Sequence, residues 1–323
     1  MNVLDQAFGE NYAMYHGDCV GVAKGLPDSS IHFSVFSPPF SQLYVYSDSE
    51  NDMGNCANDD EFFQHFDFLI SELHRVTIPG RLCAVHCKQL VNYKGRDGMA
   101  GLRDFRGEII RHFIAAGWAY HSEVCIWKDP VIEQERTKAH GLLHNRLLVD
   151  STVSRQGLPD YLVVFRRWPE SEEEADKMEP VSHAGTCEED FGMVPPDAQH
   201  IRPWPKKWQR YASPVWFDIE QTNVLNIQQA RESQDEKHIC PLQLDVIKRA
   251  LELWTNPGDL VFDPFMGIGS TGYVALELGR KALGCELKRA YFEVACKNLE
   301  DMERLKAQPT LCGFSDAELE QAS

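Results

Sequence analysis

Residues 259–287 read DLVFDPFMGIGSTGYVALELGRKALGCEL, and this stretch decides the fold. An apolar strand ends at Asp263, a turn with three glycines follows, and a helix leads to a second strand that ends at Glu286. Glycine lets the backbone approach a ligand closely, and the start of the helix faces that ligand with free N–H groups. An acid at the end of the second strand is placed to bind the two hydroxyls of a ribose. The stretch therefore predicts a site for a cofactor that contains a nucleoside.

Two nucleoside cofactors compete for this loop. The spacing of Gly267, Gly269 and Gly272 matches the GxGxxG fingerprint of NAD-binding proteins, which is a weak signal by itself. The Asp263 carboxylate lies just before the turn, where it repels a pyrophosphate but suits a cationic amino-acid group. S-adenosylmethionine carries an ammonium and a sulfonium, so Asp263 favours the methyl donor over NAD.

Alternating strand and helix patterns extend over most of the chain. Strand patterns cover residues 12–16, 31–36, 81–87, 120–127, 160–167, 259–263 and 281–286. Helical patterns cover residues 60–76, 105–117, 242–254, 270–278 and 290–305. Strands separated by helices predict a doubly wound, mostly parallel α/β sheet.

The composition divides the chain into four segments. Residues 1–167 and 239–306 carry the regular patterns, whereas residues 168–238 are rich in Pro, Trp and charge with weak periodicity. We expect this middle segment to be an irregular insertion, acidic at first and then rich in Trp, Lys and Arg. Residues 307–323 are expected to form a C-terminal tail.

The net charge of −17 argues against a nucleic-acid partner, but the charge is unevenly distributed. Residues 170–190 hold nine acids and one lysine, whereas residues 88–111 hold six Lys/Arg against three acids, and residues 201–216 combine four Lys/Arg with three Trp. Such cationic, aromatic loops suit a nucleic-acid backbone and its bases, with solvated loops as the alternative. The candidate DNA-contacting residues are Lys88, Lys94, Arg96, Arg103, Arg106, Lys206, Lys207 and Arg210.

Nothing in the sequence indicates secretion or a membrane span. His140 and His144 have the spacing of metal ligands on a helix, but no Cys or Glu supplies a third ligand, so no metal is expected. No apolar run approaches the roughly 20 residues of a membrane helix, and the N-terminus lacks the layout of a signal peptide. We expect a cytoplasmic protein without a membrane partner. The ten cysteines are scattered without a CxxC pair and are expected to be reduced core thiols.

A second stretch, IHFSVFSPPFSQ at residues 31–42, places two prolines directly after an apolar strand. Ligands of a doubly wound sheet bind outside the carboxyl ends of its strands, so Ser37-Pro38-Pro39-Phe40 is expected at that rim. The Ser37 hydroxyl and the Pro38 carbonyl can accept hydrogen bonds from an exocyclic amine, and Phe40 offers a flat face to a base. A rigid turn with no ligand is the alternative.

An exocyclic amine of adenine or cytosine is a weak nucleophile because its lone pair is delocalised into the ring. Two acceptors that hold its hydrogens favour a pyramidal nitrogen and free the lone pair for in-line attack on a sulfonium methyl. This chemistry requires no covalent intermediate with the enzyme, so no catalytic cysteine is expected.

The combination of SPPF after one strand and DPFMGIGSTG after another resembles the DNA amino-methyltransferases, which methylate adenine N6 or cytosine N4. The tetrapeptide precedes the glycine loop, as in the family's β arrangement, in which the order of motifs is circularly permuted. YHGDCVGVAKGLPDSSIHFSVFSPPF and HICPLQLDVIKRALELW also match the family. The resemblance covers most of residues 12–167 and 238–300.

The resemblance implies a class I S-adenosylmethionine-dependent methyltransferase fold, with a seven-stranded sheet that contains one antiparallel strand. Residues 1–167 would form the target-base half and residues 239–306 the cofactor-binding half. The base, flipped out of DNA, would be held and stacked by the catalytic residues Ser37, Pro38, Pro39 and Phe40. The cofactor would be bound by Asp18 at its adenine, Glu286 at its ribose, and Asp263, Phe265, Gly267, Gly269, Ser270 and Thr271.

The resemblance leaves the target base open. Ser at the first position of the tetrapeptide is commoner in cytosine-N4 enzymes, whereas residues 103–144 are similar to phage and prophage methylases, some of which modify adenine with relaxed specificity. The predicted partner is DNA, in a restriction-modification or phage setting, with a homodimer left open. RNA or protein-amide methylation, an NAD-dependent oxidoreductase and a non-catalytic DNA-binding protein are the alternatives.

Overall fold

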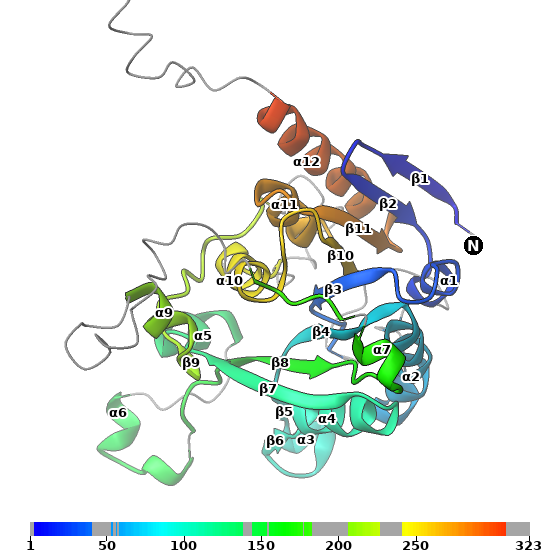
Figure 1. Cartoon of the computed structure of the whole chain (residues 1–323). Helices are drawn as coiled ribbons and strands as arrows, with labels where there is room; N and C mark the ends of the chain where they lie inside the picture. Colours follow the sequence, from blue (N-terminus) through cyan, green and yellow to red (C-terminus); the bar gives the residue numbers. More distant parts are fainter. Residues whose placement is uncertain are drawn as a thin grey trace, which may run out of the picture.

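The computed structural model describes residues 3–40, 53, 56, 58–137, 144–153, 155–176, 178–182, 206–226 and 241–307. A nine-stranded sheet with the strand order β1-β2-β11-β10-β3-β4-β8-β7-β9 runs through this part of the chain (Figure 1). Its strands are β1 (Asp5–Phe8), β2 (Tyr12–His16), β3 (Ile31–Phe36), β4 (Thr77–Lys88), β7 (Ala119–Ile126), β8 (Asp160–Arg166), β9 (Val215–Trp216), β10 (Leu260–Asp263) and β11 (Lys281–Glu286). A separate two-stranded sheet pairs β5 (Leu90–Asn92) with β6 (Gly101–Arg103).

Helices connect most of these strands. They are α1 (Cys19–Lys24), α2 (Asp59–Val76), α3 (Lys94–Asp97), α4 (Phe105–Ala115), α5 (Pro130–Thr137), α6 (His144–Leu147), α7 (Glu172–Asp176), α9 (Lys206–Tyr211), α10 (Leu244–Trp254), α11 (Ser270–Glu277) and α12 (Arg289–Ala307), with a short 3₁₀ helix at Ser151–Val153. The predicted helices are confirmed with ends shifted by one or two residues, as is usual for frayed termini. None of the helices in the described ranges has the length and apolar character needed to span a bilayer.

The seven central strands have the predicted arrangement. Strands β2, β11, β10, β3 and β4 are parallel, and β8 runs antiparallel to both of its neighbours, β4 and β7. Two short edge strands extend the sheet: β1 is antiparallel to β2, and β9 is parallel to β7. These edge strands are too short to show a hydrophobic period in the sequence, and their pairing depends on the neighbouring strand.

Helices cover both faces of the sheet, as expected for a doubly wound fold (Figure 1). Helices α1, α2 and α4 pack with one set of buried side chains, whereas α10, α11 and α12 pack with a second set. Strand β8 separates the two sets by strict alternation, because Val163 and Phe165 point to the first and Leu162 and Val164 to the second. The sheet is therefore buried on both faces, and its rims remain for function.

The predicted irregular insertion contributes to the main sheet. Within the described residues 206–226, β9 pairs with β7, and Trp216 is fully buried. Two residues are enough to add a strand here, because the neighbouring strand β7 offers free backbone groups at its edge. Of the expected C-terminal tail, residues 307–323, Ala307 is the last residue of α12. Residues 308–323, 183–205 and 227–240 lie outside the described residues.

Candidate functional site

The two predicted motifs meet at one rim of the sheet. Strand β3 pairs in parallel with β10, with Phe33 opposite Val261 and Ser34 opposite Phe262. Parallel neighbours end at the same rim, so the tetrapeptide that starts at Ser37 lies beside the turn that follows Asp263. Strands β3 and β10 occupy the centre of the sheet in Figure 1.

The tetrapeptide is partly buried at this rim. Pro38 and Pro39 are buried, whereas Ser37 and Phe40 are half-buried. The Phe40 ring lies 6.1 Å from the Phe105 ring in an edge-to-face arrangement and 6.4 Å from the His86 ring, measured between centroids. Contacts from neighbouring strands and from α4 thus hold Phe40, while part of its side chain remains exposed.

Two glycines of the loop have backbones that other residues rarely adopt. Gly267 has φ +56° and Gly269 has φ +96°. An added Cβ at Gly269 would lie 3.3 Å from the Cα of Ala295 on α12, whereas an added Cβ at Gly267 would meet nothing within 4 Å. Gly269 is therefore needed for packing, and Gly267 borders open space in front of the first turn of α11.

Asp263 is a buried carboxyl group at the end of β10. Its side chain accepts a hydrogen bond from the N–H of Phe265 at 2.8 Å, and the residue is 4% exposed. Burial raises the pKa of Asp263 to about 7, and hydrogen bonds from Thr271 and Phe265 offset only part of this effect. A cationic ligand beside Asp263 would stabilise its charged form.

The other predicted cofactor residues gather at the same rim. Asp18 follows β2 and accepts a hydrogen bond from the N–H of Gly21 at 2.7 Å, which caps α1. The Glu286 carboxylate, at the end of β11, accepts hydrogen bonds from the N–H groups of Gly267 at 2.9 Å and Lys288 at 2.8 Å. The N–H of Gly17 donates to the Glu286 carbonyl at 3.0 Å, which holds the Asp18 turn beside the end of β11.

The first turn of α11 supplies the remaining two predicted residues. The Ser270 hydroxyl is buried without a hydrogen-bond partner among the described residues. The Thr271 hydroxyl donates to the Val35 carbonyl on β3 at 3.3 Å. Ser270 thus brings a buried hydroxyl without a partner to the start of α11, and Thr271 joins the two halves of the site.

A network behind Ser37 was not predicted. The Ser37 hydroxyl lies 3.1 Å from Nδ1 of His86, and Nε2 of His86 lies 3.1 Å from the Asp160 carboxylate. The ammonium of Lys128 contacts the same Asp160 oxygen at 2.7 Å. Because β8 is antiparallel, its first residue, Asp160, lies at the rim where β4 and β7 end. In the sequence, the sign of this network is that His86, Lys128 and Asp160 are polar residues at the ends of three predicted strands.

Asp160 has the electrostatic character of a permanent carboxylate. Burial by itself would raise its pKa, but the hydrogen bond from His86, together with the charge and hydrogen bond of Lys128, holds the pKa of Asp160 well below its usual value. His86, Lys128 and Asp160 are each 7% exposed. Buried charges at a ligand-binding rim are characteristic of functional sites.

Several predicted DNA-contacting cations have partners within the protein. Arg103 pairs with Asp59 at 2.8 Å, and Arg106 pairs with Glu123 at 3.0 Å. The remaining pairs are Lys207 with Glu252 at 3.7 Å and Arg210 with Asp218 at 3.9 Å. Lys88 is half-buried and Lys94 is exposed, whereas the side chains of Arg96 and Lys206 lie outside the described residues. The role of these cations in DNA binding stays a prediction.

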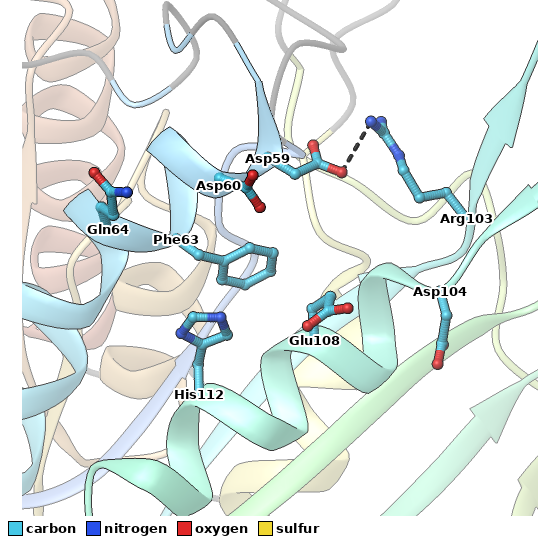
Figure 2. Close-up of a pocket in the computed structure, with 8 residues that line it drawn as sticks. All are labelled: Asp59, Asp60, Phe63, Gln64, Arg103, Asp104, Glu108 and His112. Carbon is cyan, nitrogen blue, oxygen red and sulfur yellow. Dashed lines mark ion pairs between the residues drawn. The ribbon is translucent and has the colours of Figure 1, made fainter. Parts of the chain in front are cut away.

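A hollow of about 550 Å³ lies between α2 and α4 (Figure 2). It is lined by Asp59, Asp60, Phe63, Gln64, Arg103, Asp104, Glu108 and His112. Four carboxylates line it together with Arg103 and His112, and the His112 ring is stacked on that of Phe63. This excess of negative charge does not suit a phosphate backbone. No group of three or more potential metal ligands occurs among the described residues.

Comparisons with known proteins agree on one family. The family model described as DNA methylase, for N6/N4 methyltransferases, matches residues 31–297. The type II methyltransferase M1.MboII of Moraxella bovis is 42% identical over 66 residues, which is 20% of this chain and 25% of that protein. The type II methyltransferase M.BglII of Bacillus subtilis is 25% identical over 87% of this chain and 67% of its own. The match therefore spans only a quarter of the first of these relatives.

A solved structure shows the same fold. It is a Thermus thermophilus protein described as a DNA modification methylase, in complex with S-adenosyl-L-methionine. Its TM-score is 0.59 at 18% sequence identity, over 94% of this chain and 98% of that one. The class I methyltransferase fold predicted from the sequence is thus confirmed.

Proposed function

Because the chain belongs to the DNA methylase family, we propose that it transfers a methyl group from S-adenosylmethionine to the exocyclic amine of adenine or cytosine in DNA. The observation that carries this proposal is the parallel pairing of β3 with β10, which brings Ser37 and Phe40 beside the loop after Asp263. An acceptor for the amine, an aromatic face for the base and a cofactor loop are then adjacent.

The residues at the rim fit the proposed cofactor. Open space at Gly267, the unpartnered Ser270 hydroxyl and the N–H groups at the start of α11 form a polar cradle. Asp263 suits the cationic methionine end, Glu286 the ribose and Asp18 the adenine. When bound, S-adenosylmethionine supplies an electrophilic methyl group on a sulfonium.

The target-base half would hold the nucleophile. The Ser37 hydroxyl and the Pro38 carbonyl accept hydrogen bonds from the amine, which directs its lone pair toward the cofactor half. Phe40 stacks on the base, which flips out of the duplex at a cost of a few kcal/mol. Exposed cations such as Lys94, on the β5–α3–β6 segment, would contact the DNA backbone.

Methylation assays test this function directly. Purified protein with labelled S-adenosylmethionine should label duplex DNA, and nucleoside mass spectrometry of the product should show N6-methyladenine or N4-methylcytosine. Transfer to RNA or protein but not to DNA would contradict the proposed substrate. Calorimetry should show binding of S-adenosylhomocysteine and none of NAD, because Asp263 would repel a pyrophosphate.

Three further points concern the whole protein. They are the proposed cytoplasmic location, the oligomeric state, for which a homodimer stays open, and the proposed restriction-modification or phage setting. Light scattering of the purified protein measures the second, and digestion of methylated DNA with a panel of restriction enzymes shows whether methylation is limited to one sequence.

A further inference from the structure

The network behind Ser37 connects the proposed target amine to a buried ion pair. It runs from Ser37, after β3, through His86 on β4 to Asp160, the first residue of β8. Lys128, just after β7, closes it from the other side of Asp160. Four strand ends at one rim thus supply a continuous path of contacts, each of 3.1 Å or less. Ser37 is half-buried, whereas His86, Asp160 and Lys128 are buried.

The partners fix the direction of each hydrogen bond. An ionised Asp160 can only accept, so Nε2 of His86 carries the proton and donates it to the carboxylate. In the neutral form of His86, Nδ1 is then unprotonated and accepts a hydrogen bond from the Ser37 hydroxyl. The lone pairs of the Ser37 oxygen are consequently free to accept a hydrogen of the target amine.

We infer that His86 and Asp160 act through Ser37 as a proton relay for the target amine. This inference rests on the proposed methyl transfer. The amine nitrogen forms a bond to the methyl carbon, the carbon–sulfur bond breaks with its electron pair on sulfur, and the nitrogen is left with one proton too many. That proton passes to the Ser37 oxygen while the Ser37 proton passes to Nδ1 of His86. The imidazolium is stabilised by Asp160 and later releases the proton to water.

Lys128 has a defined part in this arrangement. It neutralises Asp160 before the reaction, which allows the carboxylate to stay buried and charged beside a neutral imidazole. Without Lys128, Asp160 would be a buried carboxylate with no ammonium beside it, which is costly at a position only 7% exposed. Lys128 is therefore assigned as a positioning residue of the relay.

The test compares two His→Gln substitutions. The amide of His86→Gln can still accept a hydrogen bond from Ser37 but cannot take up its proton. We expect a fall in kcat on the order of 100-fold, with the KM for S-adenosylmethionine and the affinity for S-adenosylhomocysteine changed less than about twofold. His112→Gln is the matched control, because His112 also contacts an aspartate, Asp67, at 2.7 Å but lies at the acidic hollow of Figure 2. It should retain wild-type kcat.

Other outcomes would overturn the relay. A kcat for His86→Gln within about threefold of wild type would show that His86 only orients Ser37, and equal losses in kcat and cofactor affinity would show a structural role. If His86→Gln fails to fold by circular dichroism, free imidazole should restore transfer by His86→Ala but not by His86→Ala/Ser37→Ala. Rescue of both, or of neither, contradicts the relay. Inactive wild type would instead refute the proposed function.

Discussion

The hydroxyl of Thr271 donates a hydrogen bond to the carbonyl oxygen of Val35, although 236 residues separate them. Thr271 lies in the first turn of α11, which follows the glycine loop, and Val35 lies two residues before Ser37. One buried contact therefore couples the cofactor half to the target-base half.

Thr271→Val should weaken this junction. Valine keeps the shape of threonine but removes the hydroxyl from both of its partners, the Val35 carbonyl and the Asp263 carboxyl, which costs about 1–3 kcal/mol in the free energy of unfolding. Urea titration measures the loss. Thr271→Ser is the matched control because it retains the hydroxyl, and equal stability of the two variants would show that the hydrogen bond contributes nothing.

Asp263 should make the stability of the free protein depend on pH. Its folded pKa of about 7 exceeds the ordinary value of 3.8, so its contribution is fully present below the ordinary value and is lost as pH rises through about 7. Asp263→Asn should remove this part of the dependence. Asp218→Asn is a control of opposite sign, because pairing with Arg249 outweighs burial and lowers the pKa of Asp218. Stability curves of the wild type and Asp263→Asn that stay parallel would contradict the assignment.

The same carboxyl should control cofactor binding. A cationic ligand binds the ionised form of Asp263, so the affinity for S-adenosylmethionine should rise between about pH 5.5 and about pH 7.5 and then level off. Calorimetry at several pH values measures this. Asp263→Asn should bind more weakly and with a flat profile over the same range; a wild-type profile that is already flat would show that the ligand cation does not face Asp263.

Gly267→Ala and Gly269→Ala should separate binding from stability. At Gly269 the new methyl group meets the backbone of α12, so the free energy of unfolding should fall by more than about 1 kcal/mol. At Gly267 the methyl group enters the open space, and S-adenosylhomocysteine affinity should fall roughly tenfold. Gly279→Ala is the control for backbone strain alone, because Gly279 has φ +73° and free space around it. An unchanged affinity of Gly267→Ala would place the cofactor elsewhere.

Phe40→Ala should lower kcat/KM for DNA without changing the affinity for the cofactor. Stacking on an aromatic side chain contributes about 1–3 kcal/mol per base, so kcat/KM for DNA should fall by roughly 5- to 150-fold. The affinity for S-adenosylhomocysteine should stay within about twofold. Phe68→Ala, on an exposed ring of α2, provides the control. Parallel losses of both affinities would assign Phe40 to the structure and not to the base.

The sequence predicted those parts of the fold whose signals are local. Strands 31–36 and 281–286 have the predicted bounds, because strands buried on both faces are continuous apolar runs. The rim position of the tetrapeptide followed from the doubly wound pattern, whereas the contact of His86 with Asp160 depends on the antiparallel register of β8, which no local pattern reveals. The same holds for ion pairs such as that of Lys207 with Glu252. A cationic stretch shows charge but not which charges have partners.

Lys94 and Arg106 should respond differently to truncation, although both belong to the same basic stretch. Lys94 is exposed on α3, so Lys94→Ala should reduce the salt dependence of DNA binding by about one counterion without loss of stability. Arg106 pairs with Glu123 and lies 4.6 Å from the centroid of the Tyr161 ring, so Arg106→Ala should lower stability. Fluorescence anisotropy at several salt concentrations, with urea titration, measures both effects. Lys281→Ala, exposed at the opposite rim of the sheet, should change neither. A salt dependence unchanged in Lys94→Ala would exclude the β5–α3–β6 segment from the DNA-contacting surface.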